Sequence, residues 1–421
     1  MPQTQPLPAL DVPEAKISYP IIRIARPILP LAARALHFRE PVILHPERLV
    51  SAYRDFQQKK IRLIVGFRHP YGDDPHLMAY LFLHSLPKAA RKLKIKLKNP
   101  THVHFVYGVE VMFWSGNFVR WLLPRVGALP VNHIHMDSKG MNLIRKTIAN
   151  GPFPLALAPE GHVTYRSEQP GEIETGTARF CFWCEEDLLR ENRDEEVIFL
   201  PLSQHYRYGK NAEKKLDEFL RNLELECGVV SGGTDFSGRL RTIGKAILET
   251  LQEFYTELSG KPCGNNQSAI LIAALEACER ILSVTPVQTD PSIARIYRVR
   301  AAGWDRIFRK DLDDMTPLRM AMTDRETGEA WYAMRHMEMS ELLSYISLTE
   351  IPNNAHIEQY IEIANNFYDL AERIKGGTLR NRANFFMKNP VIVPGDPMHI
   401  SEYSKLYKEN KKRPSPKFRK I

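Results

Sequence analysis

The sequence predicts an α/β protein in which a central β-sheet is flanked by helices, followed by a C-terminal helical extension. Two observations lead to this prediction. Between residues 44 and 235, short apolar runs of strand length alternate with amphipathic stretches of helical period, as in layered α/β domains. After about residue 235 only the helical period recurs, and no comparable strand signal is visible.

Four segments follow from this pattern. They are an N-terminal arm (1–43), the α/β domain (44–235), the helical extension (236–404) and a basic tail (405–421). The chain has 421 residues, of which 43% are hydrophobic, and this length favours two domains over one.

The elements of the α/β domain can be placed in order. Leu49, Tyr53 and Phe56 recur on one face of a short helix, and the apolar run that begins at Ile61 predicts the first strand. Predicted strands cover 61–65, 102–106, 127–131, 153–158 and 197–202, and predicted helices cover 46–58, 75–90, 111–126, 138–150 and 177–191. Helices without intervening strands are predicted at 216–223, 240–254 and 357–374.

The N-terminal arm contains an apolar stretch, 17–38, that is interrupted by three arginines and three prolines. A membrane-spanning helix needs about 20 mostly apolar residues, so we expect no such helix here, and we expect no signal peptide. The stretch suits a segment that lies in a membrane interface, which we favour, or a strap across the protein's own core. The helix at 111–126 either covers the sheet or faces a membrane or an acyl chain.

The net charge of +9 is concentrated at the C-terminus. Residues 405–421 contain eight basic residues and one acidic residue, so this tail carries +7 of the charge. Such a tail binds anionic lipid or nucleic acid, or is simply a solvated terminus, and we expect no nucleic-acid partner. Five scattered cysteines indicate a reducing, cytoplasmic compartment, and Cys181 and Cys184 are predicted to be buried thiols rather than metal ligands.

The stretch from Gly66 to Pro75 carries the first chemical signal. His69 follows the strand at 61–65 in a turn rich in Gly, Pro and Asp, and Asp74 stands five residues later at the start of the next helix. In α/β sheets, ligands bind outside the carboxyl ends of the strands. A histidine there can take a proton from an alcohol while a carboxylate fixes its tautomer. The alternatives are a core histidine and a helix N-cap aspartate.

A second signal is the turn Pro159-Glu160-Gly161, which follows the strand at 153–158. The glycine allows a ligand to approach the backbone closely, and the acid can hold a hydroxyl. Downstream, Arg166 offers a forked cation that suits phosphate. The alternative is an ordinary strand-ending turn with a surface arginine.

The order of these motifs resembles that of the glycerolipid acyltransferase family of the PlsC type, which acylates glycerol 3-phosphate or lysophosphatidic acid. The resemblance covers roughly residues 60–205. The matching residues are His69 and Asp74 (the catalytic His-x4-Asp pair), 127–132 (the second block, GALPVN), Glu160 and Gly161 (the third block) and 200–202 (the fourth block). The resemblance implies a layered acyltransferase-type domain.

The resemblance also implies a reaction. A fatty acyl group would move from an acyl thioester, either acyl-CoA or acyl carrier protein, to a hydroxyl of a glycerol phosphate or lysophospholipid-type acceptor. His69 would be the general base, oriented by Asp74, while Glu160 and Gly161 would position the glycerol part and Arg166 would contact the phosphate. No metal and no cofactor besides the thioester co-substrate is implied, and the enzyme would be cytoplasmic and peripheral to a membrane surface.

Two features depart from the family pattern where phosphate is expected to bind. Asn132-His133 replaces the usual Asp-Arg, and Arg166 follows the Pro-Glu-Gly turn three residues later than usual. Lys139 and Arg145 are candidate substitutes, although a solvated helix face explains them equally well. The basic run 91–98 could dock an acidic carrier protein. The rival function from another class is a catalytically inactive membrane-surface protein that binds lipid with the same fold.

Overall fold

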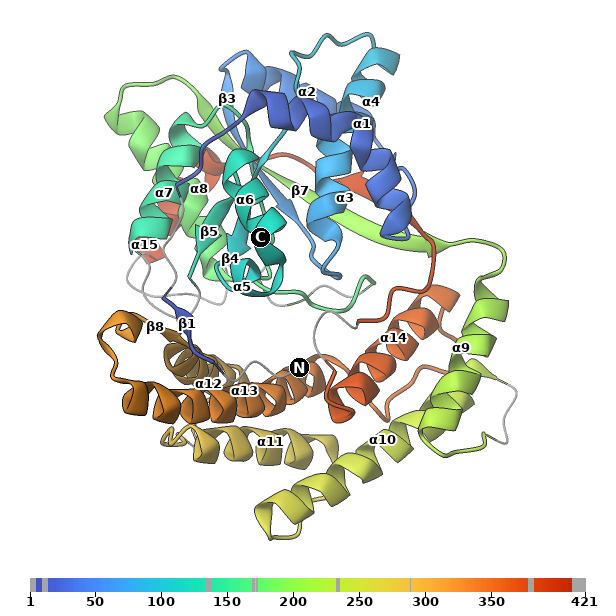
Figure 1. Cartoon of the computed structure of the whole chain (residues 1–421). Helices are drawn as coiled ribbons and strands as arrows, with labels where there is room; N and C mark the ends of the chain where they lie inside the picture. Colours follow the sequence, from blue (N-terminus) through green and yellow to red (C-terminus); the bar gives the residue numbers. More distant parts are fainter. Residues whose placement is uncertain are drawn as a thin grey trace. The chain divides into compact units, whose positions relative to one another are not determined.

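The computed structural model describes residues 5–9, 14–132, 138–168, 171, 173–231, 235–287, 289–377 and 382–410. The chain divides into two units. The sheet unit comprises residues 12–209 and 386–421, and the helical unit comprises residues 1–11 and 210–385. Figure 1 shows the elements of each.

The sheet unit is built on a mixed β-sheet. Its strands are β2 (Val42–Ile43), β3 (Ile61–Phe67), β4 (His104–Gly108), β5 (Leu129–Val131), β6 (Leu155–Leu157), β7 (Glu196–Tyr208), β9 (Lys388–Pro394) and β10 (Met398–His399). Their order is β2-β9-β7-β3-β6-β4-β5, and β10 also pairs with β7. The strands from β7 to β5 run parallel to one another, whereas β9 runs antiparallel to β7. The predicted α/β class, with a central sheet flanked by helices, is therefore confirmed.

Helices cover both faces of this sheet (Figure 1). On one side lie α1 (Tyr19–Ala35), α2 (Pro46–Gln57), α3 (Asp74–Tyr80), a π-helical turn (Leu81–Ser85) and α4 (Leu86–Lys92). The remaining helical elements are α5 (Val111–Trp114), α6 (Gly116–Arg125), α7 (Ser138–Asn150), α8 (Thr175–Arg190), a 3-10 turn (Ile400–Tyr403) and α15 (Ser404–Asn410). The helix predicted at 138–150 agrees with α7 at both ends.

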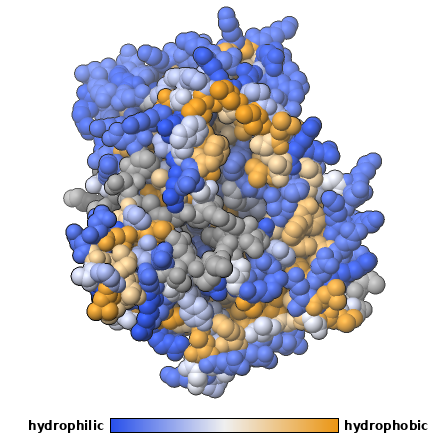
Figure 2. Space-filling model, in the orientation of Figure 1, coloured by the Kyte–Doolittle hydropathy of each residue, from blue (hydrophilic) through white to orange (hydrophobic). Residues whose placement is uncertain are grey.

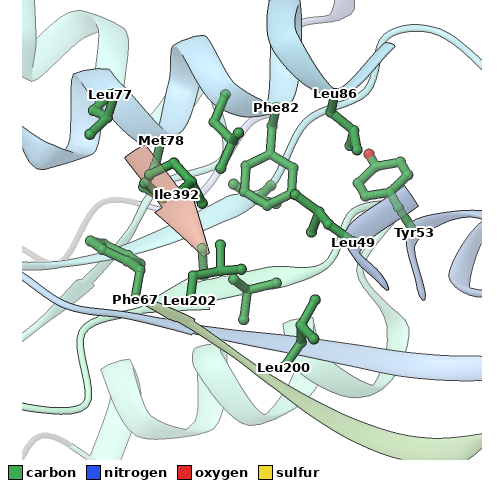
Figure 3. Packing of buried hydrophobic residues seen from close by; sticks show 14 of the residues in the cluster. Leu49, Tyr53, Phe67, Leu77, Met78, Phe82, Leu86, Leu200, Leu202 and Ile392 are labelled. Atoms are coloured by element: carbon green, nitrogen blue, oxygen red, sulfur yellow. The ribbon is translucent and has the colours of Figure 1, made fainter. Parts of the chain in front are cut away.

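The larger core lies between the sheet and helices α1 to α4. Side chains of a strand point alternately to its two faces, so Leu63, Val65 and Phe67 of β3 all enter this core. Figure 3 shows Phe82 and Ile392 among the side chains packed there. Each such residue is buried almost completely and contributes about 1.5–3 kcal/mol. This packing anchors the C-terminal end of β3.

The opposite face of the sheet is covered by α7, α8 and the C-terminal segment. Phe182 of α8 and Tyr407 of α15 stack with their ring centroids 3.9 Å apart. Cys181 and Cys184 are buried free thiols on α8, as predicted, and burial raises the pKa of both.

The helical unit has its own core of buried side chains. Its elements are α9 (Ala212–Glu226), α10 (Phe236–Ser259), α11 (Gln267–Ile281), α12 (Ser292–Ile307), α13 (Pro317–Tyr345), α14 (Ile357–Ile374), a 3-10 turn (Leu312–Asp314) and the paired two-residue strands β1 (Leu7–Pro8) and β8 (Phe308–Arg309). Arg295 and Glu279 form a fully buried ion pair between α12 and α11, with Nη2 and Oε2 2.7 Å apart. The helices predicted at 216–223, 240–254 and 357–374 are all present.

The expectation that no strand follows residue 235 is wrong. β9 joins the sheet of the sheet unit between β2 and β7, and its side chains alternate between buried and half-buried. Two prolines shorten its apolar run, and its pairing depends on residues far away in the chain. The helical unit also begins at Lys210 rather than 236, and the chain returns to the sheet unit at Phe386. Most of the predicted basic tail, from residue 411, lies outside the described residues.

The N-terminal arm contributes α1, which packs on one side and is open on the other. Ile22 and Ala33 are buried, whereas Ile24, Ile28 and Leu31 are exposed. Figure 2 shows apolar side chains gathered where α1 runs in Figure 1. In the part of the chain that the structure describes, no helix is long and apolar enough to cross a bilayer.

Candidate active site

His69 and Asp74 contact each other at the carboxyl end of β3. Nδ1 of His69 lies 3.0 Å from Oδ2 of Asp74. Asp74 is fully buried, whereas the His69 side chain is 18% exposed. Within the described residues, Nε2 of His69 has no hydrogen-bond partner. The pair therefore leaves Nε2 as the ring atom that can meet a substrate.

The Asp74 carboxylate is held by donors from two other places. The backbone N–H of Tyr71 donates to Oδ2 over 2.8 Å, and the hydroxyl of Tyr206, on β7, donates to Oδ1. The N-cap of α3 is Asp73 rather than Asp74. The Asp74 side chain thus serves the histidine and its turn instead of capping the helix.

Burial shifts the protonation of this network. It raises the pKa of the Asp74 carboxyl, while the hydrogen bonds from His69, Tyr206 and Tyr71 act in the opposite direction. Burial and the neighbouring Asp74 charge raise the pKa of Tyr206 well above its ordinary value. The Tyr206 hydroxyl consequently keeps its proton and remains a donor to the carboxylate.

Glu160 is buried beside the dyad, and its carboxylate is used internally. Its Oε2 accepts the backbone N–H of His69 over 3.1 Å. Its Oε1 accepts the N–H of Gly171 over 2.8 Å and lies 3.5 Å from Nε of Arg68. The predicted role was to position the glycerol part of a substrate. The contacts that the structure shows fix the backbone of the His69 turn, and the role towards a substrate stays a prediction.

Arg68 ties this turn to the segment that follows Glu160. Its guanidinium donates to the carbonyl oxygens of Ser167, over 2.6 Å, and Arg166, over 2.9 Å. In return, the N–H of Thr164 donates to the carbonyl of His69 over 2.9 Å. The two strand-end turns, at β3 and β6, are thereby joined by backbone and side-chain bonds.

Gly161 and Arg166 lie in the segment that follows β6. Gly161 has a φ of +72°, and a Cβ on it would lie 2.9 Å from Cγ of Glu174, so the turn requires glycine. The carbonyl of Arg166 accepts a hydrogen bond from the Arg68 guanidinium, and the Arg166 side chain is half-buried. Arg145 forms an ion pair with Asp187, with Nη2 and Oδ1 2.6 Å apart, which commits it within the fold. His133, which stands where the family pattern has an arginine, lies outside the described residues.

An apolar cavity of about 300 Å³ borders the dyad turn on the α8 side of the sheet. Gly66, Phe67 and Arg68, at the end of β3 and just after it, border this cavity, and Phe67 also packs in the core between the sheet and helices α1 to α4. Arg68, Glu160 and Ser203 form the polar end of the cavity. Its apolar wall includes Cys181, Phe182, Phe199, Met398, Ile400 and Tyr403. The C-terminal segment therefore closes a cavity whose polar end borders the turn that carries His69, and neither His69 nor Asp74 is among its lining residues.

Comparison of the chain with protein-family models, curated proteins and solved structures finds no match in any of the three. The functional argument accordingly rests on the residues themselves. Among the described residues, no group of three or more His, Cys, Asp or Glu side chains is placed to hold a metal ion.

Two residues of the site, Tyr206 and Arg68, are not indicated by the motifs of the sequence. Tyr206 lies 132 positions from Asp74 on a strand predicted to end at residue 202, so no local spacing links them. Arg68 is adjacent to His69, and its charge inside a turn after an apolar strand was a signal that could have been used.

Proposed function

We propose that the sheet unit is an acyltransferase that moves a fatty acyl group from an acyl thioester, acyl-CoA or acyl carrier protein, to a hydroxyl of a glycerol phosphate or lysophospholipid-type acceptor. The observation that carries the proposal is the dyad at the end of β3. His69 is partly exposed, and its Nδ1 is bonded to a buried carboxylate. Such a pair can act as a general base towards an alcohol.

The mechanism needs no covalent acyl-enzyme. Nε2 of His69 takes the proton of the acceptor hydroxyl as its oxygen attacks the thioester carbonyl. The carbonyl carbon–sulfur bond then breaks, and the leaving thiolate takes the proton back from the imidazolium. Asp74 keeps the ring in the tautomer with the proton on Nδ1 and stabilises the imidazolium. General-base help of this kind contributes about 10²–10⁴ in rate.

The cavity beside Arg68 supports an acyl group as the transferred group. Ligand cavities begin at about 300 Å³ and are lined mainly by apolar side chains with a few polar groups at one end. The cavity here has that volume and that distribution, and Glu160 joins its polar end to the backbone of His69. Because His69 does not line this cavity, we place in it only the distal part of the hydrocarbon chain, away from the reacting carbonyl.

The exposed side of α1 supports the proposal that the protein binds a membrane surface. Ile24, Ile28 and Leu31 follow helical spacing, and the segment 16–39 contains five basic residues and no acidic residue. Phe118 and Trp121 of α6 are also exposed. Apolar side chains among arginines suit the interface of an anionic bilayer.

The decisive experiment measures thioester consumption with a panel of lysolipid and glycerol phosphate acceptors. His69→Ala should lower turnover by at least about 100-fold, and Asp74→Asn should lower it as well. His76→Ala is the matched control, because His76 is exposed on α3 a few residues away.

Equal turnover by wild type and His69→Ala would exclude the catalytic role. The rival function, a lipid-binding protein without catalysis, is favoured by the same α1 surface. It predicts vesicle binding without thioester consumption in any of these proteins.

A further inference from the structure

Lys388 is a buried lysine at the start of β9, next to the candidate active site. It is 5% exposed. Its backbone is held by the segment 37–39: its N–H donates to the carbonyl of His37 over 2.7 Å, and its carbonyl accepts the N–H of Arg39 over 3.0 Å. The register of β9 on β7 pairs Lys388 with Tyr208 and Pro390 with Tyr206. The return of the chain from the helical unit thus brings this one charge to the dyad.

The contacts of the ammonium group include a carboxylate and two aromatic rings. Nζ is 3.1 Å from Oδ2 of Asp73, 5.1 Å from the ring centroid of Tyr71 and 5.7 Å from that of Tyr206. The two rings meet edge to face, with centroids 5.0 Å apart. A buried ammonium is costly unless it is paired, and these groups supply the pairing.

The residues that Lys388 contacts also hold Asp74. Tyr71 donates its N–H, and Tyr206 donates its hydroxyl, to the two carboxylate oxygens. Asp73 is the neighbour of Asp74 in the chain. Lys388 therefore contacts Tyr71 and Tyr206, the two residues besides His69 that are hydrogen-bonded to Asp74. It also balances the charge of Asp73.

We propose that Lys388 is a positioning residue that holds the hydrogen-bond donors of Asp74 in place and neutralises Asp73, so that Asp74 keeps His69 oriented as the general base. The inference rests on the proposed function. The ionisable groups around the dyad are His69, Tyr71, Asp73 and Asp74 with Arg68 and Glu160 beside them, Tyr206 on β7 and Lys388 on β9.

The first test compares pH–rate profiles of kcat for acyl transfer. Lys388→Met leaves the Asp73 charge uncompensated, which favours the protonated base, so the acidic limb should move to higher pH by about one unit. Asp73→Asn leaves the ammonium uncompensated, so its limb should move to lower pH. The double variant should return towards wild type, and Lys388→Arg should keep the wild-type limb.

Lys88→Met is the matched control, because Lys88 is an exposed lysine of α4 that pairs with Glu40. It removes the same charge and should leave the limb in place. The Asp73→Asn result keeps the test decisive if Lys388→Met does not fold. The proposal would be overturned if the acidic limb of the pH–rate profile stayed at the wild-type pH in both Lys388→Met and Asp73→Asn, even with lowered thermal stability. Lys388 would then be a structural residue.

A second readout does not depend on acyl transfer. Diethyl pyrocarbonate modifies neutral imidazole, and peptide mapping quantifies its reaction at His69. At pH 6.5 the reaction at His69 should slow several-fold in Lys388→Met and quicken in Asp73→Asn. If neither the wild type nor any variant consumes thioester, the proposed function fails. This measurement still decides whether Lys388 changes the protonation of His69. Unchanged reactivity in both variants would again overturn the inference.

Discussion

The Tyr206 hydroxyl donates a hydrogen bond to the Asp74 carboxylate across 132 positions of the chain. Tyr206 lies on β7 and Asp74 begins α3, so the contact joins the sheet to the helix that follows the His69 turn. Oδ1 is thereby occupied, and Oδ2 receives His69 and the N–H of Tyr71. The Asp74 carboxylate can therefore rotate only if it loses at least one of these hydrogen bonds.

Tyr206→Phe should therefore lower kcat while leaving KM nearly unchanged. A hydrogen bond to a charged group contributes about 1.5–3 kcal/mol, which corresponds to about a 10- to 100-fold loss of turnover. Steady-state kinetics of acyl transfer measure it. Tyr107→Phe is the control, because Tyr107 is a half-buried tyrosine of β4 whose hydroxyl contacts the sulfur of Met112. A similar loss of kcat in both variants would show that the effect is not specific to Asp74.

Glu160→Ala should destabilise the sheet unit more than it changes any substrate contact. The substitution removes the acceptor of the His69 and Gly171 N–H groups and the carboxylate beside Arg68, whose side chain is only 16% exposed. We expect a loss of about 2 kcal/mol or more in the free energy of unfolding, because buried donors lose their partner. Glu160→Gln should lose less than half as much.

The control for Glu160 is Glu168→Ala. Glu168, 20% exposed, pairs with Arg207, which is 45% exposed, and lies 3.5 Å from His205. A partly exposed ion pair of this kind contributes about 0–1 kcal/mol. Denaturant unfolding of all three variants gives the comparison. Equal losses for Glu160→Ala and Glu168→Ala would contradict an internal role for Glu160.

Ala178→Phe should shift acyl-donor preference towards shorter chains. Ala178 lies on α8 and lines the cavity, so a phenyl group there occupies part of its volume. Relative kcat/KM values for a series of saturated acyl thioesters test this. Leu189→Phe adds bulk at an exposed position of the same helix and should leave the preference unchanged. An unchanged ranking in Ala178→Phe would remove the cavity from the acyl site.

Local patterns predicted the contacts that lie within one turn or between neighbouring strand ends. His69 and Asp74 share a short turn, and Glu160 follows β6, the parallel neighbour of β3. Because ligands bind at the carboxyl ends of such strands, the sequence placed all three residues at one site. Tyr206 and Lys388 depend on β7 running on to Tyr208 and on β9 pairing with it. Which of two distant segments pair in a sheet depends on tertiary packing, and local periodicity does not show it.

Ile24→Asp combined with Ile28→Asp should abolish binding to anionic vesicles. The two isoleucines are 61% and 52% exposed on α1, and transferring each into the bilayer interface contributes up to about 1.5–3 kcal/mol. Flotation with vesicles that contain anionic lipid should show at least about a 10-fold loss of bound protein. Leu225→Asp, at an 80% exposed position of α9, is the matched control. Undiminished binding by the double variant would place the membrane contact elsewhere.

Acidification should weaken the sheet unit through His102. Burial lowers the pKa of this histidine from 6.5 to about 4, although its bond to the carbonyl of Val126 acts in the opposite direction. Between pH 6.5 and 4 the unfolded chain binds a proton that the folded state excludes. Stability is therefore fully present above pH 6.5 and falls as the pH decreases, by up to about 3 kcal/mol. His102→Gln, which retains a donor but does not titrate, should flatten this dependence. Hydrogen exchange of β3 and β4 at pH 7.5 and pH 5 reports on the sheet unit alone, and an identical pH dependence in both proteins would contradict the assignment.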